Sequence, residues 1–106
     1  MSKTLTKEEL VRANWLVELR RQGHRQCVGA RNEYGNVCAL ELLSEQLGVE
    51  DHCKAAILAG LSFRQMATVG NLNDGVSFDR TKTRVHNRVH TFAEIADIIE
   101  EWFKKA

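Results

Sequence analysis

The feature that most constrains the fold is the amphipathic stretch that begins at Thr91 and ends at Phe103. At the period of an α-helix, its apolar side chains fall on one side and its acidic side chains on the other. Thr91 and Glu94 have the spacing of a capping box, in which each side chain bonds the backbone of the other residue at a helix start. The pattern predicts a C-terminal helix whose apolar side packs on a core.

A first helix is predicted between Thr6 and Gly23. Thr6 and Glu9 repeat the capping-box spacing at its start, and glycine is common just past a helix end. One apolar row along this helix is formed by Val11, Trp15, Leu16 and Leu19. A second apolar row, on the remaining surface, is formed by Leu10, Ala13 and Val17. The helix is therefore expected to pack on more than one side.

The middle of the chain is also predicted to be helical. Leucines three and four residues apart indicate one helix within residues 38–48. Asp51 can cap a short helix within residues 51–60. Ser62 opens a further capping box, which begins a helix over residues 62–69. These segments are expected to be compact and helical.

The helical period is lost between Gln26 and Asn36. Turn-forming residues at 31–36 are flanked by short apolar segments, a pattern typical of a hairpin. The sequence as a whole predicts an α+β, mainly helical fold with four to five helices and a short β-hairpin near residues 26–38. Residues 1–106 are expected to form a single compact domain, because the chain is too short for two cores.

Composition limits the classes of function. Fifteen Lys and Arg against fourteen Asp and Glu give a net charge of +1, which favours neither a nucleic-acid coat protein nor an acidic DNA mimic. No apolar run is long enough to span a bilayer and no apolar signal segment follows Met1, so a cytoplasmic protein without membrane contact is expected. The three cysteines, which form no CxxC pair, are expected to be reduced and partly buried.

Several short motifs follow one another in a recognisable order. They are Trp15–Arg21, Gln26–Gly29, Cys38–Leu40, Leu72–Gly75 and Thr91–Glu100. This order resembles a family of small uncharacterised proteins of tailed phages and prophages, which has a Cys-x-Leu helix and a C-terminal LND…FAEIADxIE motif. The chain departs from the family in two places. It has a single cysteine in Val37-Cys38, where the family has two adjacent cysteines. Residues 76–90 separate its Asn-Asp from the last helix, where the family has only a few residues. The resemblance implies a mobile-element origin and supplies no catalytic residue.

The most concentrated positive charge lies in a segment without acidic residues. Its basic residues are Arg80, Lys82, Arg84, His86, Arg88 and His90. Arginine grips phosphate with two hydrogen bonds, and the free amides at the start of the Thr91 helix offer an anion site. The segment is therefore expected to bind a phosphate-bearing ligand such as a nucleotide. The alternative is a solvated loop whose charges pair with the acidic faces of helices.

Two polar residues that precede Gly75 offer further contacts for a ligand. Asn73 and Asp74 could bond a ribose or a base edge, and the alternative is a turn that closes the preceding helix. His86 and His90 are four residues apart, but no acidic third ligand lies close, so no metal site is predicted.

A second basic cluster lies at residues 20–25, together with Arg31. These charges suit the negative end of the first helix. They would form a continuous anion-binding groove only if the fold brought them beside Arg84 and Arg88.

Nothing in the sequence indicates catalysis. Cys27 follows His24, and Cys53 follows His52, but sequence neighbours of this kind are not an arranged nucleophile and base, and structural thiols are expected. No glycine-rich phosphate loop, nucleophile elbow or paired carboxylates occur. The protein is predicted not to be an enzyme and to need no cofactor.

Three functional hypotheses follow. The first is a small non-enzymatic binding protein of phage or mobile-element origin that captures a nucleotide or similar ligand at the basic segment. The second is an interaction module that docks on a host or phage protein, or forms a homo-oligomer, through spare apolar surface on the first helix. A duplex-DNA binder is disfavoured, because the net charge is near zero and no recognition-helix pattern occurs.

Overall fold

The protein is mainly helical, as predicted. The computed structural model describes residues 5–27, 37–78, 84–86 and 88–104. Within those residues the α-helices are α1 (Lys7–Arg21), α2 (Ala39–Leu47), α3 (His52–Leu58), α4 (Phe63–Asp74) and α5 (Phe92–Trp102). The shorter elements are the 3₁₀ helix η1 (Gly23–Arg25) and the strands β1 (Val76–Phe78) and β2 (Arg84–His86).

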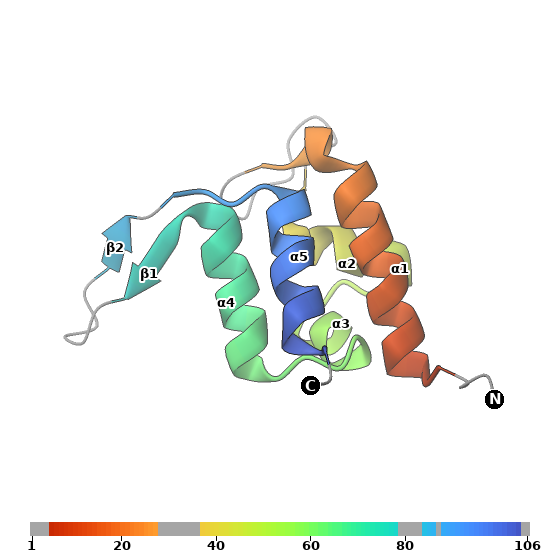
Figure 1. Cartoon of the computed structure of the whole chain (residues 1–106). Helices are drawn as coiled ribbons and strands as arrows, with labels where there is room; N and C mark the ends of the chain where they lie inside the picture. The colour runs from red at the N-terminus through yellow and green to blue at the C-terminus, as the bar shows by residue number, and fades with distance from the viewer. Residues whose placement is uncertain (1–4, 28–36, 79–83, 87, 105–106) are drawn as a thin grey trace.

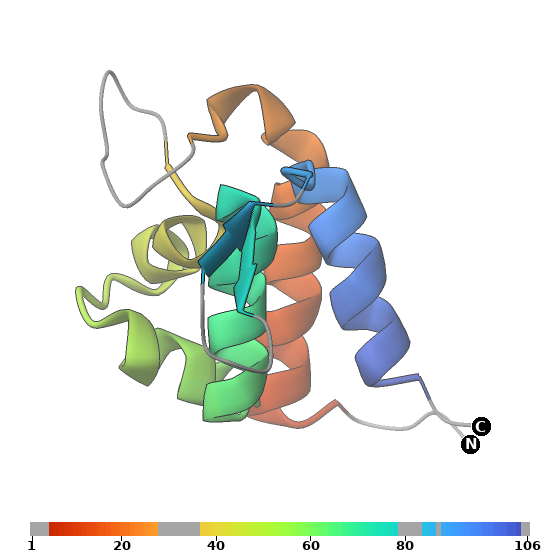
Figure 2. The same cartoon turned by 90° about the vertical axis from the view of Figure 1, so that its left-hand side faces the viewer.

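Helices α4 and α1 stand on opposite sides of the helical body in Figure 1, with α5 between them in that view. The second view shows α5 on one side of them and α2 with α3 on the other (Figure 2). Helix α5 packs on α1 and α4, whereas α2 and α3 pack on each other and on the same two helices. Helix α5 thus covers one side of α1 and α4, and α2 with α3 covers the other side.

The core draws buried apolar side chains from all five of these helices. Its largest buried members include Trp15 on α1 and Phe92 on α5. The indole Nε1 of Trp15 donates a hydrogen bond to the Ala39 carbonyl at 3.0 Å, so its polar group is satisfied in the interior. Helix α5 buries the predicted side, with Phe92, Ile95, Ala96 and Ile99.

The predicted helix starts are confirmed. Capping boxes form at Thr6, Ser62 and Thr91, where each hydroxyl accepts the backbone N–H three residues on. Helix α4 is longer than predicted and ends at Gly75, whose φ of 69° is the left-handed conformation that glycine adopts at little cost. The turn predicted before Gly75 therefore follows a last helical turn that contains Asn73 and Asp74.

The β-hairpin predicted near residues 26–38 is not supported. Residues 28–36 lie outside the described residues, and the flanking residues Gln26 and Val37 form an isolated parallel bridge. Strands of a hairpin pair antiparallel, so this bridge is a different arrangement. An antiparallel pair occurs instead between β1 and β2, where Val76 pairs with His86 and Phe78 with Arg84. Short strands without clear alternation gave no signal there.

Candidate functional site

The residues predicted to bind a ligand are placed unequally by the structure. Arg80 and Lys82 lie outside the described residues, in the connection between β1 and β2. Arg84 and His86 lie on β2 itself. Figure 1 shows the β1–β2 pair extending to one side of α4, away from α1. This part of the predicted site is thus carried by a two-stranded arm.

Asn73 is a buried structural residue, which corrects its predicted contact with a ligand. Its side chain is 1% exposed. The amide oxygen accepts the N–H of Ala39 at 3.2 Å and the Nε2 of Gln26 at 3.1 Å. The amide nitrogen donates to the Cys27 carbonyl at 2.8 Å and to Asp74 Oδ1 at 3.0 Å. Protein groups therefore use both ends of this amide.

Gln26 extends the same network to the start of α5. Its Nε2 also donates to the His90 carbonyl at 2.7 Å, and its Oε1 accepts the N–H of Phe92 at 3.1 Å. The His90 N–H donates to the Leu72 carbonyl at 2.9 Å. Hydrogen bonds thereby connect three chain segments, around residues 26, 73 and 90. We name this set of contacts, centred on Gln26 and Asn73, the amide hub.

The start of α5 is not the open anion site that the sequence suggested. The Thr91 N–H donates to Glu94 Oε1 at 3.0 Å, and the Glu94 N–H donates to Thr91 Oγ1 at 3.2 Å. The Phe92 N–H is taken by Gln26. Side chains of the protein therefore already occupy three donors that a phosphate would use.

Arg88 is paired inside the chain. Its Nη1 lies 2.8 Å from each carboxylate oxygen of Glu94. The hydrogen bond from Arg88, followed by the Thr91 N–H, lowers the pKa of Glu94 to about 2. His90 Nδ1 lies 3.1 Å from the Arg88 carbonyl oxygen. The structure thus pairs Arg88 with an acidic residue of α5, which is the alternative that the sequence offered to phosphate binding.

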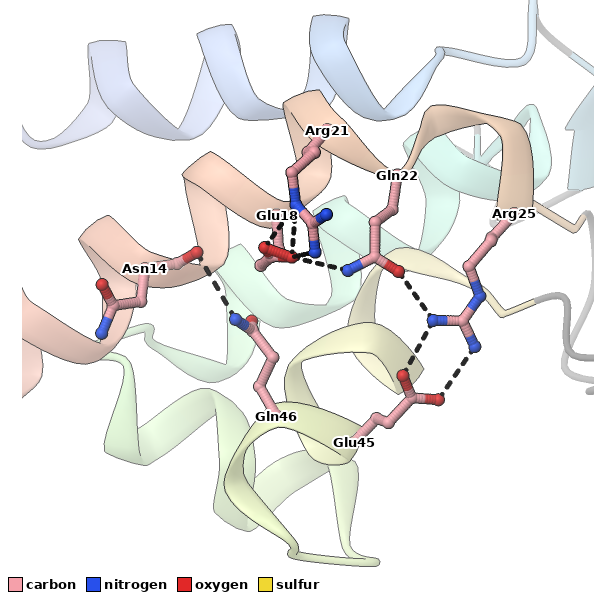
Figure 3. A network of polar contacts seen from close by, with 7 residues as sticks. All are labelled: Asn14, Glu18, Arg21, Gln22, Arg25, Glu45 and Gln46. Carbon is pink, nitrogen blue, oxygen red and sulfur yellow. Dashed lines mark hydrogen bonds and ion pairs between the residues drawn. The ribbon is translucent and has the colours of Figure 1, made fainter.

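The second basic cluster is also internally paired. Arg21 donates to Glu18, with its Nε 2.9 Å from Oε2. The two terminal nitrogens of Arg25 donate to the two carboxylate oxygens of Glu45 at 2.8 Å and 3.0 Å. Both contacts are drawn in Figure 3. These arginines lower the pKa of both Glu18 and Glu45, through hydrogen bonds above all. Gln22 lies between them and bonds both Glu18 and Arg25.

The acidic face of α5 separates the two basic regions. Arg20 of α1 donates to Asp97 at 2.9 Å and to Glu100 at 3.0 Å, while Arg88 bonds Glu94 near the start of the same helix. Carboxylates that pair with both regions weaken the attraction for an anion between them. The described contacts thus give no support to the continuous groove through Arg88, and Arg31 lies outside the described residues.

The cysteines are thiols and half-buried, as predicted. Burial raises the pKa of Cys38, which caps α2 by accepting the Glu41 N–H, so its thiol is a weak nucleophile. No group of three or more His, Cys, Asp or Glu suited to a metal occurs among the described residues. No helix in the described part of the chain is long and apolar enough to cross a membrane.

The surface of α1 carries exposed apolar side chains. Leu10 and Val17, two turns apart on α1, are 52% and 59% exposed, and Ala13 between them is exposed as well. We name these three residues the outer α1 face. The sequence predicted this face from the second apolar row of the helix.

Three further exposed apolar side chains were not predicted. They are Ile57 and Leu58 at the end of α3 and Phe63 at the start of α4, and Phe63 is 68% exposed. Phe63 follows the capping residue Ser62, so its spacing suggested only a helix start. A hollow of about 300 Å³ was also missed, because its walls come from opposite ends of the chain, near Leu16 and Phe103.

Comparisons of this chain with protein-family models, with curated proteins and with solved structures found no match. The resemblance to tailed-phage proteins therefore stays a prediction.

Proposed function

We propose that this protein is a non-enzymatic interaction module that docks on a partner protein through the outer α1 face. The observation that carries the proposal is the exposure of Leu10 and Val17, both more than half exposed on one well-formed helix. Apolar side chains two turns apart on one face are the pattern of a helix that enters an apolar groove or packs on another helix. A host or phage protein, or a second copy of the chain, would supply that partner surface.

The charged groups support this choice by exclusion. Arg20, Arg25 and Arg88 each have a carboxylate partner within the chain, so their capacity for an external ion is reduced. Docking on apolar side chains does not require breaking those pairs, because desolvation of apolar surface provides the driving force. The outer α1 face therefore offers binding free energy that the fold itself leaves unused.

The test compares three versions of the protein as bait. Wild type, Leu10→Glu with Val17→Glu, and a control with Ala67→Glu and Ala93→Glu, which adds the same charge at exposed positions, are each assayed for partner capture and by light scattering over a concentration series. We expect binding by wild type and control only, since introduced carboxylates resist desolvation. Equal binding by all three would refute the role of α1.

The exposed residues Ile57, Leu58 and Phe63, where α3 leads into α4, allow one more variant in the same binding test. Phe63→Ser removes the most exposed of these side chains without touching the core. If the partner is lost with Phe63→Ser but kept when Leu10 and Val17 are both changed, the docking surface lies at these residues instead of on α1.

A second candidate function is capture of a phosphate-bearing ligand by the β1–β2 arm. It is favoured by the antiparallel pairing, which places Arg84 and His86 on a strand that extends from the helical body (Figure 1). Because Arg88 is held by Glu94, we expect Arg84→Ala to remove nucleotide-induced thermal stabilisation and Arg88→Ala to preserve most of it. Arg64→Ala, at an exposed site on α4, is the control. Unchanged stabilisation in the Arg84 variant would dismiss this candidate.

A further inference from the structure

The hollow of about 300 Å³ lies between the first half of α1 and the end of α5. Its lining residues are Leu5, Glu9, Arg12, Ala13, Leu16, Glu100, Phe103 and Lys104. This volume is at the lower end of the range for small-molecule sites, where apolar walls and a few polar groups are the rule. The hollow thus has the size and wall chemistry to take one short apolar chain.

Arg12 distinguishes this hollow from a simple apolar one. Its guanidinium lies 3.6 Å above the centre of the Phe103 ring, and its Nη1 donates to the Ala59 carbonyl at 3.0 Å. These two contacts fix the guanidinium plane at the wall of the hollow. Arg12 is half-buried and has no carboxylate partner among the residues that the structure describes.

The acidic residues of the lining are engaged elsewhere. The Glu9 carboxylate accepts the N–H of Thr6 at 3.0 Å as part of the α1 capping box. Glu100 is paired with Arg20 at 3.0 Å. Of the two cations in the lining, Lys104 has only a long 4.0 Å contact with Glu101. The hollow therefore combines apolar walls with cationic donors that retain bonding capacity.

We propose that this hollow binds a small amphipathic carboxylate, with its apolar tail against Leu5, Leu16 and Phe103 and its carboxylate on Arg12. Arg12 forms no ion pair with a described residue, and the Phe103 ring and the Ala59 carbonyl offset the cost of its half-buried charge only in part. A carboxylate matches the planar fork of the guanidinium. The site is distinct in chemistry from the docking role of α1, with which it shares Ala13.

The probe is octanoate, and octanol is its neutral counterpart. Each is titrated into the isotopically labelled protein while backbone amide shifts are followed by NMR. We expect octanoate to shift amides of the lining on α1 and α5, with an affinity at least about tenfold above that of octanol, because hydrogen bonds to charged groups are worth more than neutral ones. Equal affinities, shifts confined to other regions, or no saturable shift would overturn the proposal.

Variants locate the effect. Arg12→Gln should weaken octanoate binding about tenfold or more and leave octanol binding unchanged, whereas Ala13→Phe, which adds a ring at an exposed wall position, should block both. Arg64→Gln, remote on α4, is the matched control. If Arg12→Gln fails to fold by circular dichroism, Ala13→Phe decides alone, and unimpaired octanoate binding in that variant contradicts the site.

The variant that tests docking separates the two proposals. Leu10→Glu with Val17→Glu should leave octanoate affinity unchanged, because neither residue lines the hollow. If Leu10→Glu with Val17→Glu loses partner binding but keeps octanoate binding, the carboxylate site is supported independently of docking. If Arg12→Gln loses octanoate binding but keeps partner binding, docking is supported independently of the carboxylate site.

Discussion

Asn73→Ala is the substitution from which we expect the largest loss of stability at a polar position. The change removes four hydrogen bonds, to Ala39, Gln26, Cys27 and Asp74. Gln26, Cys27 and Asp74 have other partners or access to solvent, so the unavoidable cost falls on the buried N–H of Ala39. Each buried group left without a partner costs about 1–3 kcal/mol.

The expected total is about 2–4 kcal/mol, since the shortened side chain also leaves a small cavity. That is a large part of the ~5–15 kcal/mol that stabilises a typical domain. For a chain of this size, the melting temperature should fall by roughly 8 °C or more. Urea unfolding followed by Trp fluorescence measures the free energy directly. Asn71→Ala, a half-buried site two residues earlier on the same helix, is the control.

Asn73→Asp adds a test of the donor side of the amide hub. The introduced carboxyl would be buried beside Asp74 and, when ionised, could not donate to the Cys27 carbonyl. Its pKa in the folded state should be raised above the unfolded value of about 3.9. The folded state then binds more protons than the unfolded state, so stability should fall as the pH rises through that window. A loss independent of pH, or a loss in Asn73→Ala no greater than in Asn71→Ala, would refute the hub.

Three further predictions concern single positions. Because the pKa of Glu94 is lowered to about 2, its ionised form stabilises the fold above about pH 4.5, and this contribution is lost as the pH falls toward about 2. Glu94→Gln should therefore make the free energy of unfolding depend less on pH in this range. Ser44→Ala should be neutral or stabilise by up to about 1 kcal/mol in urea unfolding, because the buried Ser44 hydroxyl has no hydrogen-bond partner among the described residues and alanine favours helix. A loss above that size would contradict the assignment. Gly60→Ala and Gly48→Ala both place a side chain at positive φ, but only at Gly60 would the Cβ lie 2.8 Å from Arg12 Nη1, so Gly60→Ala should lower the melting temperature more and also weaken octanoate binding.

The helices were predictable because their signals are local. A capping box such as Thr91 with Glu94 spans four residues, and the buried face of α5 repeats within single turns. The amide hub has no local signal, because Gln26 meets Asn73 from 47 positions away in the chain. A sequence motif that reads as turn chemistry near Gly75 could not show that Asn73 would be buried by segments from elsewhere. The β1–β2 pair was not predicted either, because strands of three residues are too short to show an alternation of apolar and polar side chains.

Charge was the least predictable property of the site. The basic residues of 80–90 stand together in the sequence, yet Arg88 bonds the acidic face of α5, and the same face receives Arg20 from α1. Local charge density therefore overestimates the field that a ligand meets whenever a folded partner supplies the opposite sign. The apolar residues behave differently, because the exposed side chains of Leu10 and Val17 gain free energy when another apolar surface covers them. This asymmetry gives Leu10 and Val17 more weight as evidence for a partner than the paired arginines carry for an anion, and it singles out Arg12, whose charge meets an aromatic ring and a carbonyl in place of a carboxylate.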